Sequence, residues 1–109
     1  MNELNKNKIY YISHPLTCDG PEGEYKHRLE EWNTSMWFQG LFPDCGYVRP
    51  LEIIPHKFDA KQASEVWIKL LKMCDGIIMC EGWENSPGCK AEKQMAESLS
   101  LDIILYEDI

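Results

Sequence analysis

The feature that most constrains the fold is a short run at residues 75–80, in which every residue after the aspartate is apolar or glycine. A strand that is apolar on both faces is typical of a parallel sheet, because helices cover both sides of such a sheet and leave neither face to water. The run therefore predicts a buried strand and directs the search toward strands that alternate with helices.

The rest of the chain supplies that alternation. Strand-like runs occupy residues 8–13, 47–54 and 101–106, although Pro50 interrupts the second of them. Helices are expected over residues 24–40 and 59–74, where apolar residues recur at spacings of three and four. Ser86 suits an N-cap and Pro87 a first helical position, so a third helix should begin there. Loops are expected at residues 17–23 and 82–88.

The resulting order is β-α-β-α-β-α-β, which predicts an α/β fold in a single domain spanning residues 1–109. We expect one doubly wound, mostly parallel sheet of four to five strands with helices on both faces, similar to flavodoxin-like and Rossmann-like folds. Ligands of such sheets bind at the carboxyl ends of the strands. Residues 13–15 and 81–88 should therefore face a site.

Composition excludes several classes of protein. A hydrophobic fraction of 44% with four Trp residues argues against disorder, and a net charge of −7 argues against a nucleic acid polymer as partner. No apolar run approaches the roughly 20 residues that span a membrane, and the polar N-terminus does not resemble a signal peptide. Five Cys residues without a Cys-x-x-Cys pair indicate reduced thiols, so we expect a cytoplasmic protein.

Glu92 is the residue whose place in the pattern is most unusual. The stripe Met95, Ala96 and Leu99 on the third helix continues backwards onto this carboxylate. A half-buried Glu is costly unless it is paired or used, so Glu92 is either a nucleophile or base over the strand ends, or a solvated residue at the edge of the stripe. Spacing alone favours the second interpretation.

Other polar residues have simpler explanations. Ser86 either caps its helix or also binds an anion there. The three His residues show no metal-ligand spacing, so we expect no metal site and no cofactor. Asp75 is expected to end a helix or to bind loop amides. Trp32 and Trp37 would suit an interaction surface on the first helix, but core packing is the simpler interpretation.

Two segments carry a family resemblance. The opening Tyr11-Ile12-Ser13-His14-Pro15-Leu16 is similar to a Tyr-x-Ser-Gly-Pro strand and turn, and residues 74–92 are similar to a motif of apolar strand, Gly-Trp, and Ser-x-Gly-x-x-x-Glu followed by Ala. Together they resemble small domains of unknown function (DUF4406-like) related to the nucleoside 2-deoxyribosyltransferases and the deoxynucleoside 5′-monophosphate N-hydrolases. The resemblance covers almost the whole chain.

The resemblance implies a site and a reaction. Glu92 matches the nucleophile that attacks the anomeric carbon of deoxyribose, and Tyr11 matches the residue that orients it. Ser86 matches a phosphate-binding Ser in the hydrolases, which favours a nucleotide over a nucleoside. The substrate-binding residues would be Ser13, His14, Pro15, Trp83, Ser86 and Gly88. A neighbouring subunit often completes such sites, so a homo-oligomer (a dimer or larger) is implied.

Three departures keep alternatives open. Trp67 stands where the family has an Asp that protonates the leaving base, and loss of a general acid costs about 10²–10⁴ in rate. His14 replaces the Gly of the first turn, and the sequence ends three residues after Tyr106. We therefore expect either an N-glycosidase or deoxyribosyltransferase, or a domain that binds nucleotides without turnover. An interaction module that uses the first helix is a third alternative.

Overall fold

Within the described part of the chain, the sheet has four parallel strands. The structure, a computed structural model, describes residues 4–16, 21–55 and 57–109. Its strands are β1 (Ile9–Ser13), β2 (Gly46–Val48), β3 (Gly76–Met79) and β4 (Asp102–Leu105). They lie in the order β2-β1-β3-β4, and each neighbouring pair is parallel. The predicted parallel α/β sheet is confirmed.

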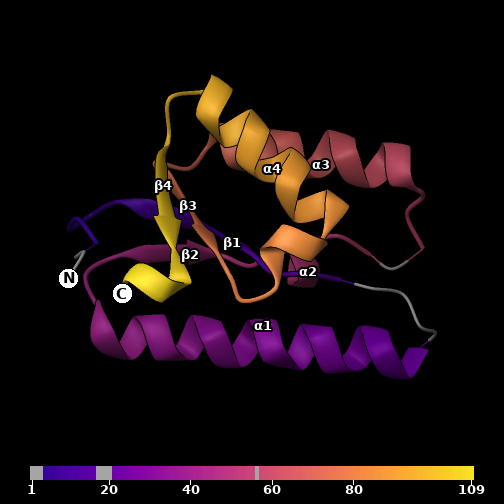
Figure 1. Ribbon diagram of the computed structural model, residues 1–109, viewed down its shortest axis with the longest axis horizontal. Helices are drawn as coiled ribbons and strands as arrows, with labels where there is room; N and C mark the ends of the chain where they lie inside the picture. The colour runs from indigo at the N-terminus through magenta and orange to yellow at the C-terminus, as the bar shows by residue number, and fades with distance from the viewer. Residues whose placement is uncertain (1–3, 17–20, 56) are drawn as a thin grey trace.

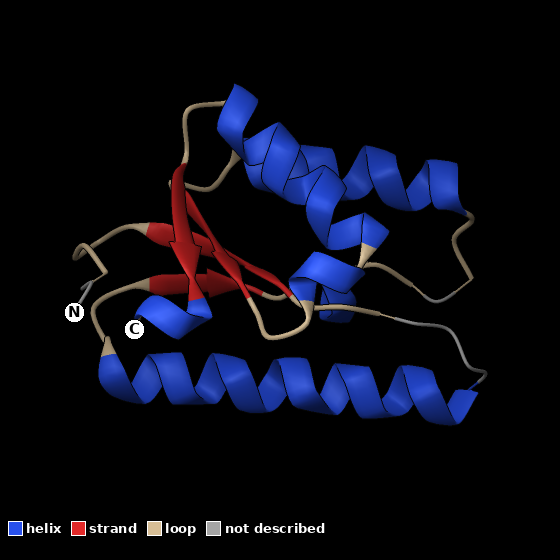
Figure 2. Cartoon of the chain, viewed as in Figure 1, coloured by secondary structure: helices blue, strands red, loops and turns tan. Residues whose placement is uncertain are grey.

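Helices cover both faces of this sheet. They are α1 (Pro21–Leu41), α2 (Pro50–Ile53), α3 (Ala60–Lys72) and α4 (Pro87–Ser98), with short 3₁₀ helices η1 (Trp83–Asn85) and η2 (Tyr106–Asp108). Figure 1 shows α1 along one side of the sheet and α3 with α4 on the other. Figure 2 shows the strands in red between these two layers. The expected doubly wound arrangement is confirmed.

Alternation along β1 divides the core in two. Tyr10 and Ile12 belong to the cluster that includes Phe38 of α1, whereas Tyr11 belongs to the cluster with Leu71 of α3 and Ala96 of α4. Successive side chains of a strand point to opposite faces, so β1 contributes to both layers. All six side chains are at most 1% exposed. Burial on both faces is what the apolar character of the central strands requires.

The helix boundaries follow from local chemistry. Asp59 and Gln62 form a capping box at the start of α3. The Ser86 hydroxyl accepts a hydrogen bond from the Cys89 amide at 3.2 Å, as predicted for the start of α4. Asp75 accepts a hydrogen bond from the Ile9 amide at 2.8 Å, which confirms its expected role as an acceptor for backbone amides.

Two sequence-based boundaries were wrong. The strand expected over residues 47–54 ends at Val48, and the chain turns into α2 at Pro50. Proline has no amide hydrogen to donate to a sheet, and its fixed φ suits the first position of a helix. The loop expected over residues 17–23 is too long, because α1 already begins at Pro21; residues 17–20 lie outside the described part of the chain.

The apolar residues that predicted α1 do not face the sheet. Where burial along this helix is described, the buried residues are Glu31, Ser35 and Phe38. The residues that predicted the helix remain 44–49% exposed, namely Leu29, Trp32, Met36 and Leu41. Trp37 is 52% exposed, so the interpretation of Trp32 and Trp37 as core residues was wrong. The side of α1 away from the sheet therefore carries an apolar surface.

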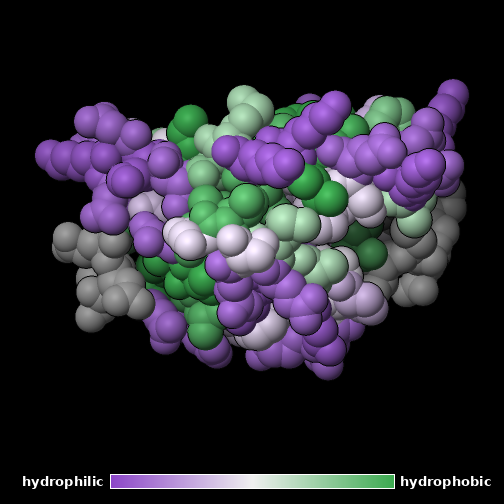
Figure 3. All heavy atoms as spheres, turned by 90° about the horizontal axis from the view of Figure 1, so that it is seen from above, coloured by the Kyte–Doolittle hydropathy of each residue, from purple (hydrophilic) through white to green (hydrophobic). Residues whose placement is uncertain are grey.

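The opposite layer has a mixed surface. Seen from the side of α3 and α4, green apolar groups lie between purple hydrophilic ones (Figure 3). Partly buried side chains such as Leu99, Leu101 and Ile103 pack there against the core. None of the helices in the described residues combines the length and the apolar character needed to cross a membrane.

Candidate functional site

The candidate site lies where the strand order reverses. β1 and β3 are neighbours in the sheet, and the chain leaves them toward opposite layers, to α1 and α4. The Cys80 amide donates a hydrogen bond to the Ser13 carbonyl at 3.0 Å, so the two strand ends are held side by side. Ligands of open α/β sheets bind at such a point.

Glu92 of α4 reaches back over β1 at this point. The Tyr11 hydroxyl donates a hydrogen bond to Glu92 Oε2, and the Ser13 hydroxyl donates to Oε1 at 2.8 Å. Tyr11 and Ser13 are two residues apart on one strand, so both side chains point to the same face. Both are buried, and each therefore holds one carboxylate oxygen from below.

The surroundings of Glu92 make its carboxylate unusually basic. Burial raises the pKa of Glu92 to about 7, and the nearby Glu31 acts in the same direction. Hydrogen bonds from Tyr11 and Ser13 counteract part of this increase. Burial also raises the pKa of the Tyr11 phenol, and the Glu92 charge adds to that effect, so the phenol stays a donor. A carboxylate with such a pKa is suited to act as a nucleophile or base near neutral pH.

A cavity of about 470 Å³ opens in front of this carboxylate. Glu92, Ser86 and Gly88 line it from α4 and its start, and His14 lines it from the end of β1. The remaining wall comes from α1, α2, α3, the adjacent loops and the first turn of α4. It consists of Leu16, Arg28, Pro50, Leu51, Ile54, Pro55, Phe58, Ala63, Trp67, Pro87 and Cys89. Its volume is within the range of small-molecule sites.

The structure brings together most of the predicted site residues, but not all. Tyr11 and Ser13 lie behind Glu92 and contact its carboxylate without lining the cavity. Pro15 is buried and also does not line the cavity. Trp83 packs against the core on the α4 side, where Lys93 Nζ lies 5.6 Å from its ring centroid. Pro15 and Trp83 therefore contribute to the packing of the site loops.

A family comparison adds to this geometry. Residues 8–105 match the model of the family described as Domain of unknown function (DUF4406). The chain belongs to this family. No curated protein matches the sequence.

The fold of this DUF4406 domain is also found in a solved structure. That structure is a 2-desoxiribosyltransferase from Leishmania mexicana, with a TM-score of 0.64 and 21% sequence identity. The match covers 91% of this chain and 63% of the other, so the DUF4406 domain spans less than two thirds of that protein. At this identity the likeness shows the fold, which agrees with the fold that the sequence predicted.

Arg28 is a residue of the cavity that sequence reasoning missed. Its guanidinium donates a hydrogen bond to the Ile54 carbonyl at 3.3 Å, and the side chain lines the same cavity as Glu92. Arginine recognises phosphate and carboxylate groups through its planar fork of donors. In the sequence, Arg28 lies among alternating charges that do not mark it as a binding residue. It reaches the cavity only because the fold brings α1 to this wall.

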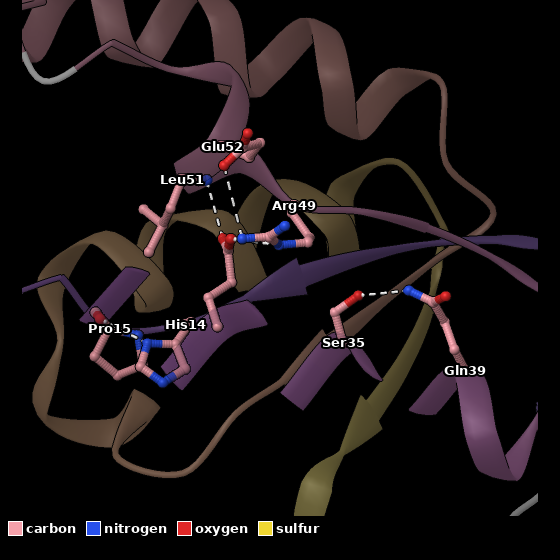
Figure 4. A network of polar contacts seen from close by, with 8 residues as sticks. His14, Pro15, Ser35, Gln39, Arg49, Leu51 and Glu52 are labelled. Carbon is pink, nitrogen blue, oxygen red and sulfur yellow. Dashed lines mark hydrogen bonds and ion pairs between the residues drawn. The ribbon is translucent and has the colours of Figure 1, made fainter. Parts of the chain in front are cut away.

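A second buried carboxylate, Glu31, was also missed. Its side chain is fully buried and accepts hydrogen bonds from Arg49 Nε at 3.1 Å and from the Leu51 amide at 2.9 Å. Figure 4 shows the Arg49 and Leu51 side of this network, with Glu52 close to Arg49. Burial raises the pKa of Glu31, while the Leu51 amide and Arg49 lower it. This network fixes α1 to the segment that opens α2.

The fold also gathers three possible metal ligands that sequence spacing separated. His14 Nε2 and His27 Nδ1 lie 3.5 Å and 3.8 Å from Glu30 Oε2. Burial lowers the pKa of His14, although its bond to the Pro15 carbonyl and the Glu30 charge act in the opposite direction. The four described cysteines are free thiols, in agreement with the expectation of reduced cysteines.

Proposed function

We propose that this DUF4406 domain binds a deoxynucleoside or its 5′-monophosphate and cleaves the N-glycosidic bond with Glu92 as nucleophile. The observation that carries the proposal is the Glu92 carboxylate itself. It lines a cavity of about 470 Å³, and two hydroxyls hold it. Its pKa of about 7 keeps it partly ionised at neutral pH.

The reaction needs a group that attacks carbon and then leaves again. One oxygen of Glu92 forms a bond to the anomeric carbon of deoxyribose while the bond to the base nitrogen breaks, and the base departs with the bonding electrons and takes up a proton. Water or a second base then displaces Glu92 from the sugar. Tyr11 and Ser13 are positioning residues, because each hydroxyl holds one oxygen of Glu92 and together they fix the orientation of the carboxylate.

Other residues of the cavity suit the remaining parts of such a ligand. Ser86 and the first amides of α4 favour an anion, and Arg28 adds a positive charge to the same cavity. Phe58 and Trp67 provide aromatic surface for a base. The resemblance to the deoxyribosyltransferases and the N-hydrolases supports this assignment, as does the name of the solved structure with the same fold.

A second candidate function is binding without turnover. Trp67 lines the cavity at the position where related enzymes carry an acidic residue, and an indole cannot protonate a leaving base. Among the described residues that line this cavity, Glu92 is the one carboxylate. A domain of this kind would sequester a nucleotide rather than cleave it.

Chromatography of free base separates the two functions. A panel of deoxynucleosides and their 5′-monophosphates is incubated with the wild type, with Glu92→Gln, and with Glu65→Gln as a control on the exposed side of α3. Cleavage predicts release by the wild type and Glu65→Gln but not by Glu92→Gln. Binding measured by calorimetry without release from any substrate would contradict the cleavage proposal and favour sequestration.

A second copy of the chain is the partner we propose. Tyr25, Leu29, Trp32 and Met36 are 44–70% exposed, and their spacings of four, three and four residues form one stripe along α1. Such a stripe packs well against a second helix of the same kind. Sedimentation equilibrium should give a dimer or larger for the wild type and a monomer for Trp32→Lys. A monomeric wild type would contradict the proposal.

A further inference from the structure

A group of three polar side chains lies at the edge of the Glu92 cavity, which one of them, His14, also lines, and the proposed cleavage gives none of the three a chemical step. His27 and Glu30 are three residues apart on α1, and His14 follows β1. One ligand atom of each residue lies within 4.8 Å of the others, and Glu30 Oε2 is shared at 3.5 Å and 3.8 Å. Ligand atoms around a tetrahedral zinc ion lie about 3.3 Å apart, so small shifts would complete this geometry.

The orientation of His14 supports a ligand role. Its Nδ1 lies 2.8 Å from the Pro15 carbonyl oxygen, as Figure 4 shows. A carbonyl oxygen only accepts, so Nδ1 carries the hydrogen and donates it. In the neutral ring, Nε2 then presents its lone pair to Glu30. Histidine ligands of metals are held in this way by a backbone carbonyl on the other nitrogen.

The charges at the cluster call for a positive partner. His14 Nε2 lies 3.5 Å from the Glu30 carboxylate oxygen, and either a proton or a metal cation between these two atoms would be attracted to both. Glu30 uses its other oxygen, Oε1, for the exposed Lys26 at 3.9 Å, which leaves Oε2 to the two imidazoles. One oxygen of Glu30 therefore faces the exposed Lys26, and the other faces the two imidazoles.

The ligand set also indicates the class of ion. Two imidazole nitrogens and one carboxylate oxygen suit zinc and its transition-metal neighbours, whereas magnesium and calcium prefer oxygen ligands. Three protein ligands leave a fourth position open. His14 and Glu30 both line a second cavity of about 590 Å³, which also contains Asn33, Thr34 and Glu81. A fourth ligand could therefore come from that cavity.

We propose that His14, His27 and Glu30 form a binding site for one divalent transition-metal ion, with zinc as the best fit, and that this ion joins α1 to the end of β1. The expectation of no metal site rested on sequence spacing, which does not show that residues 14 and 27 meet. The proposal is independent of the proposed reaction, because the ion is not given a part in it.

Cobalt(II) and zinc(II) titrations of the whole chain, freed of metal by a chelator, test this site. We expect one cobalt per chain, an absorption spectrum of nitrogen and oxygen coordination, and displacement by zinc. Zinc should also raise the midpoint of thermal unfolding, because it binds the folded chain. His27→Gln and Glu30→Gln should each weaken metal binding by at least about tenfold. Loss of an outer-shell partner alone costs roughly this much, and these two residues are proposed as direct ligands. Glu65→Gln should bind as the wild type does.

Three results would overturn the site. They are an absence of stoichiometric binding, sulfur-to-cobalt charge-transfer absorption that assigns the ion to cysteines, and unchanged affinity in both variants. Circular dichroism checks that the variants are folded. Glu30 is 43% exposed at its side chain, so Glu30→Gln keeps the test informative even if the more buried His27→Gln does not fold.

Discussion

Glu31 and Glu92 are both withdrawn from water, yet their partners differ. Glu31 is fully buried against the Arg49 guanidinium and a backbone amide, so its charge is neutralised within the fold. From the described residues, Glu92 receives only hydroxyl hydrogen bonds, and it faces a cavity. When one partner of a buried ion pair is removed, the protein becomes less stable. A buried carboxylate that has no cation beside it already makes the native protein less stable, but it remains reactive.

The comparison assigns the two residues different roles. Glu31 joins α1 to the start of α2 and is expected to matter for folding. Glu92 stands over the strand ends and is expected to matter for chemistry. The partners of a buried carboxylate, rather than its burial alone, distinguish a structural residue from a functional one.

The largest effect should come from Glu92. Glu92→Gln keeps the size of the side chain but removes the nucleophile, so base release should fall by at least about 10³-fold, as when other covalent nucleophiles are removed. Chromatography of free base under single-turnover conditions measures the loss. If Glu92→Gln retained most of the activity, Glu92 would not be the nucleophile, and the proposed difference between Glu31 and Glu92 would be wrong.

Glu31→Gln should mainly reduce stability. The change leaves Arg49 without its buried partner, and we expect the free energy of unfolding to fall by about 3 kcal/mol. Glu52→Gln is the matched control, since Glu52 is 71% exposed and lies 3.8 Å from the same arginine. Urea denaturation measures both variants. Equal effects would mean that burial of Glu31 adds nothing to its ion pair.

The pH dependence of stability should separate the two carboxylates further. The pKa of Glu92 is about 7 in the folded chain, against 4.5 as its ordinary value. Between these values the unfolded chain releases a proton that the folded chain retains, so Glu92 lowers the free energy of unfolding as pH rises. The loss should reach about 3 kcal/mol or slightly more well above pH 7.

Glu92→Gln lacks this titration. Its stability should match that of the wild type near the ordinary carboxylate pKa of 4.5 and exceed it at pH 8. Denaturation of both proteins across this range is the measurement. Parallel stability curves would show that the pKa of Glu92 is not raised.

The smallest effect should come from Tyr11→Phe. Loss of this hydrogen bond raises the pKa of Glu92, so the acidic limb of the pH–rate profile should move to higher pH. Activity at neutral pH should fall about tenfold, as expected for a lost hydrogen bond to a charged group. Tyr10→Phe on the opposite face of β1 is the control, and an equal shift in that variant would argue against a role for the Tyr11 hydroxyl.

The sequence predicted the parts of the molecule that local patterns determine. The apolar run of β3 indicated a parallel sheet, and Ser86 with Pro87 located the start of α4. The family motif pointed to Glu92, whose contacts with Tyr11 and Ser13 agree with a positioned carboxylate. In each case the signal lies within a few residues of the feature that it predicts.

The features that were missed depend on distant residues. Glu31 and Arg49 are 18 positions apart, and no pattern links them before α1 and α2 pack together. His14 meets Glu30 only because α1 returns along the end of β1. Apolar spacing on α1 predicted a helix but not which side faces the sheet, because the buried side includes Glu31 and Ser35.

Ser86 caps the start of α4 and Glu92 lies on the same helix, so α4 fixes the distance between these two residues. Six residues of α-helix span about 9 Å, so a ligand group held at the helix start has a fixed reach to the carboxylate. Substitutions along α4 leave this spacing unchanged. A single inserted or deleted residue between the two would swing Glu92 by about 100° around the axis, away from Tyr11 and Ser13. The length of this segment should therefore vary less than its composition.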